Sequence, residues 1–214
     1  MNFKLSICIP TLNRGSFIGE TLESVVSQLE DDVEIVIVDG GSVDNTQEIV
    51  NSYQNRFTNI RYVKKSLSNE TPSNEGFDRD CNFTVELASG KYCWLMTDDD
   101  LLMPGAIRKV LNETENNYAL IVASVEIRNL DLTKLIAPRR PILQRDRMYS
   151  RNDWDQFSAS VGSHLTFVGA VVRGGTGMAD VGVGVEQGDP AGDLFALEAR
   201  HAGRVTEDGG GVLG

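Results

Sequence analysis

The chain has 214 residues, of which 41% are hydrophobic and 24% are charged, as in ordinary globular proteins. That length is enough for one domain with a substantial core and a small extension. The formal net charge of −11 argues against a nucleic-acid-binding protein, because such proteins present a basic patch.

The first part of the chain alternates short apolar runs with segments of helical periodicity. This alternation predicts an α/β fold with a mostly parallel sheet and helices on both faces. A polar stretch over residues 64–76 is expected to form a long loop. The expected strands are 5–9, 34–38, 60–63, 92–96 and 120–124, and the expected helices are 17–29, 44–53, 80–88 and 104–111.

Polar loops directly follow three of the expected strands, at residues 10–15, 39–42 and 98–100. In sheets of this kind, ligands bind outside the carboxyl ends of the strands. We therefore expect the three loops to share one rim of the sheet and to form the functional site. A non-enzymatic receiver-type domain, phosphorylated at Asp39, is an alternative that predicts Mg²⁺ binding without a nucleotide.

Three consecutive carboxylates, Asp98 to Asp100, lie in the last of these loops. Like charges this close are costly unless a cation or solvent compensates them. Hard cations such as Mg²⁺ or Mn²⁺ bind one or two carboxylates together with substrate phosphates. The cluster indicates a metal site, and an acidic loop tip before a helix is the alternative.

The three cysteines, Cys8, Cys81 and Cys93, are odd in number and widely spaced. This pattern indicates buried reduced thiols rather than a disulfide framework or a zinc site. No apolar stretch is long enough to span a bilayer, and the first residues lack the pattern of a secretory signal. The cytoplasm is the expected compartment.

The periodic pattern weakens after residue 136. Four arginines form a locally basic stretch that could contact phosphates or acidic lipid headgroups, although a solvated loop is the alternative; they are Arg139, Arg140, Arg145 and Arg147. Trp154 and Phe157 indicate a short helix.

The composition changes abruptly at about Val171, after which Gly, Ala, Val, Asp and Glu dominate. We expect this segment not to fold with the core, either as a flexible tail or as the product of a shifted reading frame or a truncated gene. The expected division is therefore a nucleotide-binding domain over 1–136, the start of an acceptor half over 137–170, and an anomalous, disordered Gly-rich tail over 171–214.

Taken together in order, the rim motifs resemble those of the family 2 glycosyltransferases. The motifs are SICIPTLNR (residues 6–14), EIVIVDGGSVDNT (34–46) and ASGKYCWLMTDDD (88–100). The segment GFDRDCN (76–82) is similar to members that transfer deoxysugars such as abequose in O-antigen assembly. The resemblance implies a Rossmann-like GT-A nucleotide-diphospho-sugar transferase fold, with an acceptor half that is incomplete here.

Roles follow from this resemblance residue by residue. It implies a donor-nucleotide site made of Pro10, Thr11, Asn13, Arg14, Asp39, Gly41, Ser42, Arg79 and Asp98. Within that set, Thr11 and Asp39 resemble positions that hold the base, and Asp98 one near the ribose. Asp99 resembles the metal ligand, with Asp100 as a second ligand, for Mg²⁺ or Mn²⁺.

The chain also departs from the family pattern. Gly40 and Thr97 stand where many members carry acidic residues, and Cys81 stands where Arg is common. Inverting members need a carboxylate base in the acceptor half. Asp153 and Asp155 are early candidates, but both fit the pattern of helix-capping acids, so no catalytic base is assigned.

The expected function is a metal-dependent inverting glycosyltransferase of cell-surface polysaccharide synthesis. Its partners would be a nucleotide-diphospho-sugar donor and a carbohydrate or lipid-linked acceptor, with peripheral contact at the inner face of the membrane. The alternative is a catalytically impaired remnant that binds the donor but lacks the acceptor half.

Overall fold

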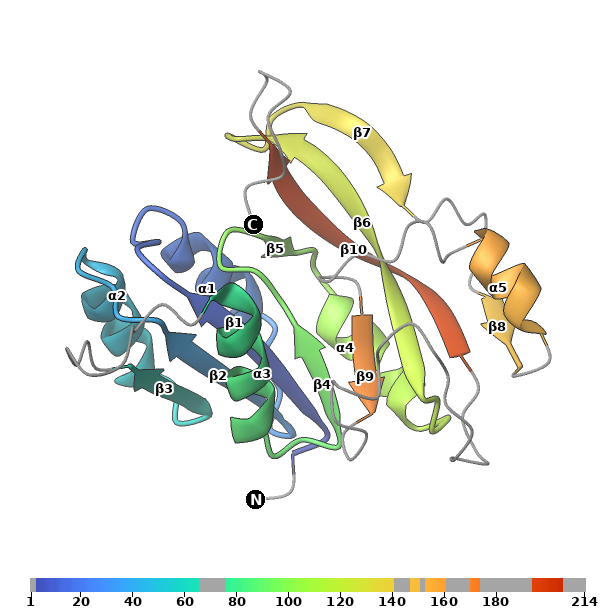
Figure 1. The fold of residues 1–214 in the computed structure, drawn as a ribbon, viewed down its shortest axis with the longest axis horizontal. Coiled ribbons are helices and arrows are strands. Elements are labelled where there is room, and N and C mark those ends of the chain that lie inside the picture. The colour runs from blue at the N-terminus through green and yellow to red at the C-terminus, as the bar shows by residue number, and fades with distance from the viewer. Residues whose placement is uncertain are drawn as a thin grey trace.

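The computed structural model shows an α/β architecture built on one mixed sheet (Figure 1). It describes residues 3–65, 76–140, 147–150, 153–160, 170–173 and 194–205. Residues 66–75 of the expected loop and Arg145 of the basic stretch lie outside this part of the chain.

The first four strands of the sheet are parallel, as predicted. Their order across the sheet is β3 (Ile60–Lys64), β2 (Val33–Asp39), β1 (Leu5–Thr11) and β4 (Tyr92–Leu95). Every residue of β1 and β2 is buried. These two strands are nearly uninterrupted apolar runs because helices cover both of their faces.

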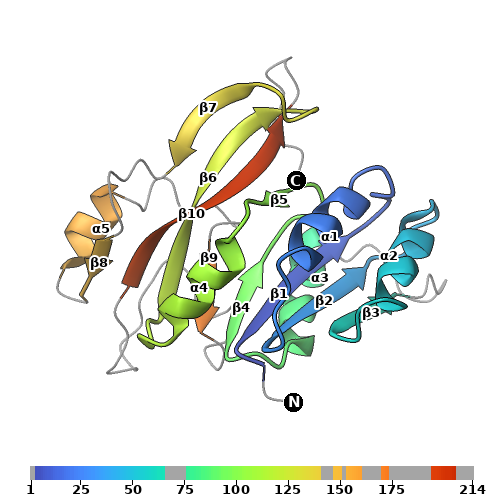
Figure 2. The same cartoon turned by 180° about the vertical axis from the view of Figure 1, so that it is seen from behind.

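Helices cover the two faces of this sheet unequally. Three lie on one face, seen from behind in Figure 2, and α3 (Phe77–Leu87) lies on the other; the three are α1 (Ile18–Val26), α2 (Thr46–Gln54) and α4 (Ala106–Thr114). All four helices lie within a few residues of their predicted positions. Helix α3 begins three residues earlier than expected, directly after Gly76, whose φ of 93° favours glycine.

The remainder of the sheet mixes orientations. Strand β9 (Ala170–Arg173) is antiparallel to both of its neighbours, β4 and β6 (Leu120–Asn129), while β10 (Leu194–Val205) is parallel to β6. The short strands β5 (Leu101–Leu102), β7 (Leu135–Arg140) and β8 (Arg147–Tyr149) pair antiparallel with β10, β6 and β10 respectively. The predicted short helix near Trp154 is α5 (Trp154–Ser160).

Parts of the segment after residue 170 belong to this sheet, unlike the expectation from its composition. Val171 of β9 is fully buried in the core, and β10 pairs along most of β6. The backbone of β6 requires partners along its edges, and these two strands supply them. Residues 174–193 and 206–214 lie outside the described chain, and the three-segment division stays a prediction.

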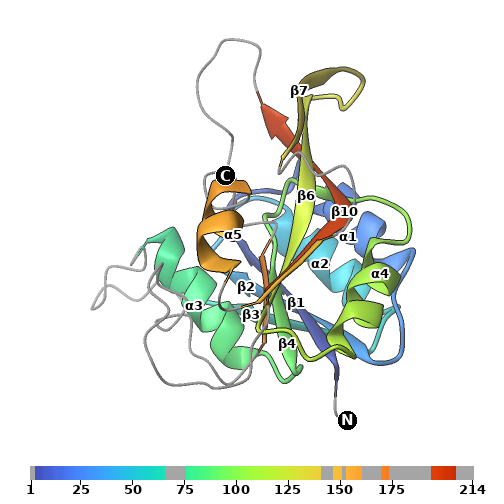
Figure 3. The same ribbon diagram turned by 90° about the vertical axis from the view of Figure 1, so that its right-hand side faces the viewer.

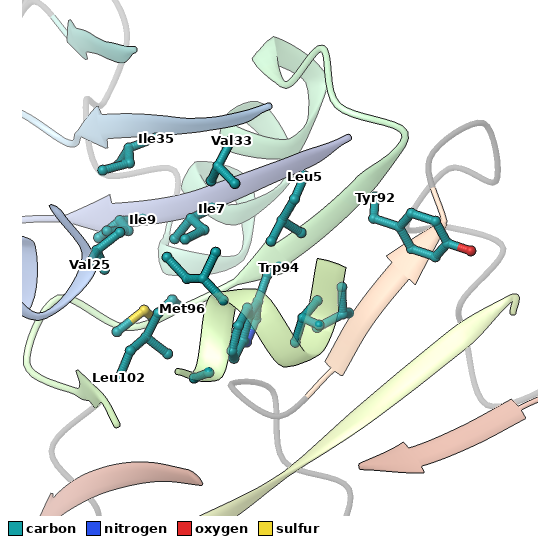
Figure 4. Packing of buried hydrophobic residues seen from close by; sticks show 14 of the residues in the cluster. Leu5, Ile7, Ile9, Val25, Val33, Ile35, Tyr92, Trp94, Met96 and Leu102 are labelled. Carbon is teal, nitrogen blue, oxygen red and sulfur yellow. The ribbon is translucent and has the colours of Figure 1, made fainter. Parts of the chain in front are cut away.

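The main core lies between the sheet and the helices α1 and α4. Ile7, Trp94 and Met96 belong to this core, as Figure 4 shows. All three are fully buried. The cysteines occupy the opposite face, in a separate cluster under α3. All three are free and buried, as predicted, and burial raises the pKa of Cys81 to about 12.

No helix among the described residues is long and apolar enough to cross a membrane.

The turn before β4 is anchored to β1 and β2 by a buried carboxylate. Glu34 Oε1 accepts hydrogen bonds from the Ser6 hydroxyl at 2.6 Å and from the Ser89 amide at 2.6 Å. The Gly90 amide donates to Ser6 Oγ at 2.8 Å. Gly90 therefore passes so close to β1 that a Cβ would lie 2.7 Å from the Ser6 backbone nitrogen.

This close approach predicts opposite effects for two glycine substitutions. Gly90→Ala is expected to lower the free energy of unfolding by about 2 kcal/mol or more, because the added Cβ meets backbone that cannot move away. Gly19→Ala in α1 adds a Cβ 3.6 Å from Ile49, an ordinary contact, and is expected to be neutral or stabilising by up to about 1 kcal/mol. Urea denaturation of both variants measures the difference, and equal effects would contradict this packing.

Candidate functional site

The carboxyl ends of β1, β2 and β4 lie side by side, so the three predicted loops do share one rim. Thr11 pairs with Asp39 in the sheet register, and Cys8 pairs with Leu95. Backbone hydrogen bonds continue just past the strands, from Gly40 N to Thr11 O and from Met96 N to Cys8 O, both at 2.9 Å.

The loops after β1 and β2 are joined by reciprocal hydrogen bonds. The Asn13 amide donates to Ser42 Oγ at 2.8 Å, and the Val43 amide donates to Asn13 Oδ1 at 2.9 Å. The Arg14 amide donates to Thr46 Oγ1 at 2.9 Å. Asn13 has a φ of 56°, in the left-handed region that Asn tolerates better than most residues. These contacts make the two loops one unit.

Asp39 organises the loop that follows it. Its side chain is fully buried, and Oδ1 accepts hydrogen bonds from the amides of Gly41 at 2.9 Å and Ser42 at 2.6 Å. The Tyr62 hydroxyl of β3 donates to Oδ2 at 2.5 Å. Burial, together with this carboxylate, raises the pKa of Tyr62 well above its ordinary value. Three donors therefore hold Asp39 as a hydrogen-bond acceptor.

A carboxylate from α3 lies where the side chain of residue 40 would be. A Cβ on Gly40 would lie 2.8 Å from Asp80 Oδ2. Asp80 forms an ion pair with Lys65 at the end of β3. Many family members carry an acidic residue at position 40. In this chain position 40 is glycine, and Asp80 of α3 places a carboxylate there instead.

The acidic cluster is enclosed rather than solvent-facing. Asp98, Asp99 and Asp100 are only 6%, 1% and 4% exposed. Asp98 Oδ1 lies 3.4 Å from Arg14 Nε, and the Thr97 hydroxyl donates to Asp100 Oδ2. Burial raises the pKa of Asp98 to about 6, although the neighbouring Thr11 hydroxyl and Arg14 guanidinium act to lower it. Desolvation is the dominant effect at this carboxyl.

Asp99 and Asp100 offer the oxygen ligands that a hard divalent cation prefers. Among the described residues, no group of three or more acidic, histidine or cysteine side chains is arranged to hold a metal by itself. Mg²⁺ commonly takes only one or two protein carboxylates and completes its shell with phosphates and water. The residues present therefore fit a cation that binds together with a phosphorylated ligand.

The structure brings most of the predicted site residues together. Pro10, Thr11, Asn13 and Arg14 come from the first loop, and the others come from the second and third, namely Asp39, Gly41, Ser42, Asp98, Asp99 and Asp100. Arg79 is an exposed residue next to Asp80 in the first turn of α3.

Three residues that contact the rim were missed in the sequence, namely Tyr62, Lys65 and Asp80. The signal for the first two was present, because β3 is the fourth parallel strand and its carboxyl end reaches the same rim. Asp80 had no such signal, since its position depends on how α3 packs against the loop.

The structure assigns Asp153 a capping role. Its Oδ2 accepts hydrogen bonds from the Ser150 amide at 3.0 Å and from the Ser150 hydroxyl at 2.6 Å, at the start of α5. Asp155 is an exposed residue in the first turn of that helix. Both positions match the capping interpretation of these acids.

An open α/β sheet with its polar loops gathered at the strand carboxyl ends defines a nucleotide-binding fold of the Rossmann-like class. Residues 6–170 match the profile of the family described as glycosyl transferase family 2. The chain belongs to this family.

Two relatives show how much of the chain is shared. An abequosyltransferase of Salmonella typhimurium, RfbV, is 30% identical over 145 residues, which cover 66% of this chain and 42% of the relative. A Campylobacter jejuni GalNAc(5)-diNAcBac-PP-undecaprenol beta-1,3-glucosyltransferase is 27% identical over 155 residues, which cover 71% of this chain and 47% of the relative. The matches thus span less than half the length of each relative.

The fold is shared with Staphylococcus aureus TarS. Its residues 1–349 in complex with UDP superpose with a TM-score of 0.72 at 18% identity, covering 95% of this chain and 61% of that one. The complex of the same protein with UDP-GlcNAc gives a TM-score of 0.69. These likenesses confirm the predicted GT-A fold.

The link between the first two loops predicts a backbone effect at Asn13. Asn13→Ala is expected to lower the free energy of unfolding by about 2 kcal/mol. It removes the acceptor for the Val43 amide, and it puts Ala at a positive φ that Asn tolerates better. Asn13→Gly loses the same hydrogen bond without the backbone strain, so its cost should be smaller by about 1 kcal/mol. Chemical denaturation of the pair measures this difference, and a more stable Ala variant would refute the strain.

Proposed function

We propose that this protein is an inverting glycosyltransferase that takes its sugar from a nucleotide-diphospho-sugar donor bound at the rim. The observation that carries the proposal is the joining of the three loops into one enclosed polar site, in a member of glycosyl transferase family 2. The name of the Campylobacter jejuni relative contains a saccharide linked to undecaprenol, and the name of the Salmonella relative gives transfer of the sugar abequose. These names support a carbohydrate or lipid-linked acceptor in cell-surface polysaccharide synthesis.

Recognition of the donor nucleotide is assigned to the first two loops. Asp39 and Thr11 serve the base, because a carboxylate held as an acceptor suits a ring N–H donor. Asp98 lies beside them for the ribose. Arg14, which is paired with Asp98, and Arg79 on α3 are assigned to the diphosphate as its positively charged partners.

Metal binding is assigned to Asp99 and Asp100, with Mg²⁺ or Mn²⁺ as the cation. When bound, such a cation would supply positive charge that stabilises the donor phosphates and the leaving nucleoside diphosphate. Thr97 holds one oxygen of Asp100 by a hydrogen bond and thereby orients the carboxylate. The two carboxylates are already desolvated, so the protein preorganises them for a cation.

Sugar transfer also needs a base that removes the proton from the acceptor hydroxyl. Asp153 is occupied as a helix cap, and no base is assigned among the described residues. The proposal therefore separates into donor binding and transfer, and a remnant that binds the donor without transferring the sugar is the alternative.

The test measures the two steps in parallel. Titration calorimetry with UDP, GDP and dTDP in the presence of Mn²⁺ reports donor-nucleotide binding. Release of the nucleoside diphosphate from the matching sugar donor, with a polyprenyl-diphosphate-linked saccharide as acceptor, reports transfer. Binding with transfer supports the enzyme, binding without transfer supports the remnant, and no binding of any nucleotide overturns both.

Removing the assigned metal ligand should separate metal-dependent from metal-independent binding. Asp99→Ala is expected to abolish the increase in nucleotide affinity that Mn²⁺ produces, and to leave the weak metal-free binding unchanged. The fold should persist, because the variant removes a buried charge without removing apolar packing. Calorimetry with and without Mn²⁺ measures the effect, and an unchanged response to Mn²⁺ would refute the assignment.

Substitution of the base-recognition residue should act at every metal concentration. Asp39→Asn is expected to weaken UDP binding about tenfold or more with and without Mn²⁺, because one acceptor oxygen is replaced by an amide donor. Tyr62→Phe keeps the carboxylate and serves as the matched control, with a smaller loss. If the loss in Asp39→Asn appeared only with Mn²⁺, Asp39 would belong to the metal site instead.

A further inference from the structure

Lys65 and Asp80 form an ion pair at the edge of the rim. Lys65 directly follows β3, and its amide donates a hydrogen bond to Asp39 O at 2.8 Å. Its ammonium pairs with Asp80 Oδ1 of α3 and lies 5.6 Å from the centroid of the Phe83 ring, which also belongs to α3. The backbone of Lys65 is thus joined to Asp39, while its side chain is held by α3.

The ion pair lies on the face of the sheet that α3 covers, opposite to the face of α1, α2 and α4 (Figure 3). The preceding residue, Lys64, points the other way, because its ammonium donates to Gln47 Oε1 of α2 at 2.9 Å. On the α3 face, Asp80 Oδ2 lies 2.8 Å from the position that a Cβ of Gly40 would take. Glycine at residue 40 therefore leaves room for the carboxylate to reach the backbone that follows Asp39.

The order of the strands places this ion pair beyond the base in the proposed donor site. The order across the sheet is β4, β1, β2 and β3. The proposed metal ligands follow β4, Thr11 ends β1, and Asp39, which is assigned to the base, ends β2. A nucleotide with its diphosphate at the metal and its base at Asp39 follows the same order. The edge of the base far from the ribose then faces the end of β3, where Lys65 and Asp80 lie.

The two side chains offer opposite hydrogen-bonding chemistry at that edge. An ammonium has three N–H donors and no acceptor, and a carboxylate has only acceptors. The ion pair itself occupies one donor of Lys65 and Oδ1 of Asp80, while Asp80 Oδ2 lies over Gly40. The two side chains are 20% and 13% exposed, so a ligand can contact them in a largely desolvated place. Nucleobases differ in this respect at their outer edge, where thymine and guanine carry a carbonyl oxygen and cytosine and adenine an amino group.

We propose that Lys65 and Asp80 are specificity-determining residues that read the outer exocyclic group of the donor base. The Lys65 ammonium donates to a carbonyl oxygen, and Asp80 Oδ2 accepts from an amino group, so the balance between them sets which base is preferred. Loss of either function changes the preference, and the two losses change it in opposite directions. This inference rests on the proposed function, because it needs a nucleotide at the rim.

The experiment is titration calorimetry of the full chain with UDP and with CDP in the presence of Mn²⁺. Uracil and cytosine differ at the outer exocyclic group and at the adjacent ring nitrogen, which is assigned to Asp39. The ratio of the two affinities in the unaltered protein therefore contains both effects. The change in this ratio between a variant and the unaltered protein isolates the effect of Lys65 or Asp80.

Two substitutions should change the ratio in opposite directions. Lys65→Met removes the donor and keeps the length of the side chain, so UDP affinity should fall about tenfold relative to CDP affinity. Asp80→Asn keeps an oxygen for Lys65 and places an amide donor over Gly40, so CDP affinity should fall about tenfold relative to UDP affinity. Lys65→Arg keeps a donor and should hold the ratio within about threefold of its original value.

Lys64→Met is the matched control. It removes the same charge one residue earlier, on the opposite face of the sheet, and should leave the ratio within about threefold of that of the unaltered protein. Circular dichroism melting shows whether each variant is folded, and if one of the two test variants does not fold, the other still measures the change in ratio. An ion pair that only joined α3 to β3 would lower stability and weaken both nucleotides equally.

Equal losses of UDP and CDP affinity in Lys65→Met and Asp80→Asn would overturn the proposal, as would an unchanged ratio or two shifts in the same direction. Binding of neither UDP nor CDP to the unaltered protein would overturn it as well. GDP and dTDP, titrated with the same protein, then decide the proposed function separately. Binding of either leaves the donor site in place, and binding of none overturns both.

Discussion

Parallel pairing of β1 with both β2 and β4 is the constraint on which the rest of the structure depends. Parallel neighbours end at the same edge, so this pairing alone puts the loops after three separate strands within contact distance. It requires crossover connections, which α1, α2 and α3 provide, and it buries β1 on both faces. The polar chemistry of the rim is therefore a consequence of how apolar residues pair and pack beneath it.

Enclosure of the acids gives the site its electrostatic character. At Asp98, desolvation raises the carboxyl pKa by more than the adjacent guanidinium lowers it. The rise from 3.8 to about 6 means that the site disfavours the charged form by about 3 kcal/mol relative to water. At Asp39, three hydrogen-bond donors compensate a carboxylate that is buried even more completely. The rim thus contains Asp39, whose oxygens accept three hydrogen bonds from the protein, and Asp98, at which burial disfavours the charged form. A cationic or metal-bound ligand would stabilise the charged form of Asp98 and leave the hydrogen bonds of Asp39 unchanged.

The elements that could be predicted are those whose signal is local. The apolar runs before Pro10 and Asp39 predict parallel strands, and helical periodicity predicts the helix between them to within a few residues. The rim loops could be predicted as well, because polar residues directly after an apolar run mark the end of a parallel strand. By contrast, Asp80 reaches Gly40 only through the packing of α3, and the burial of Asp98 to Asp100 depends on what covers them.

Strands β9 and β10 could not be predicted from the sequence for another reason. Their composition is rich in small residues, which carries little periodic signal, and their place is set by the open edges of β4 and β6. An open edge presents unpaired backbone groups that an extended segment from a distant part of the chain can satisfy, and a local sequence pattern does not reveal which segment that is.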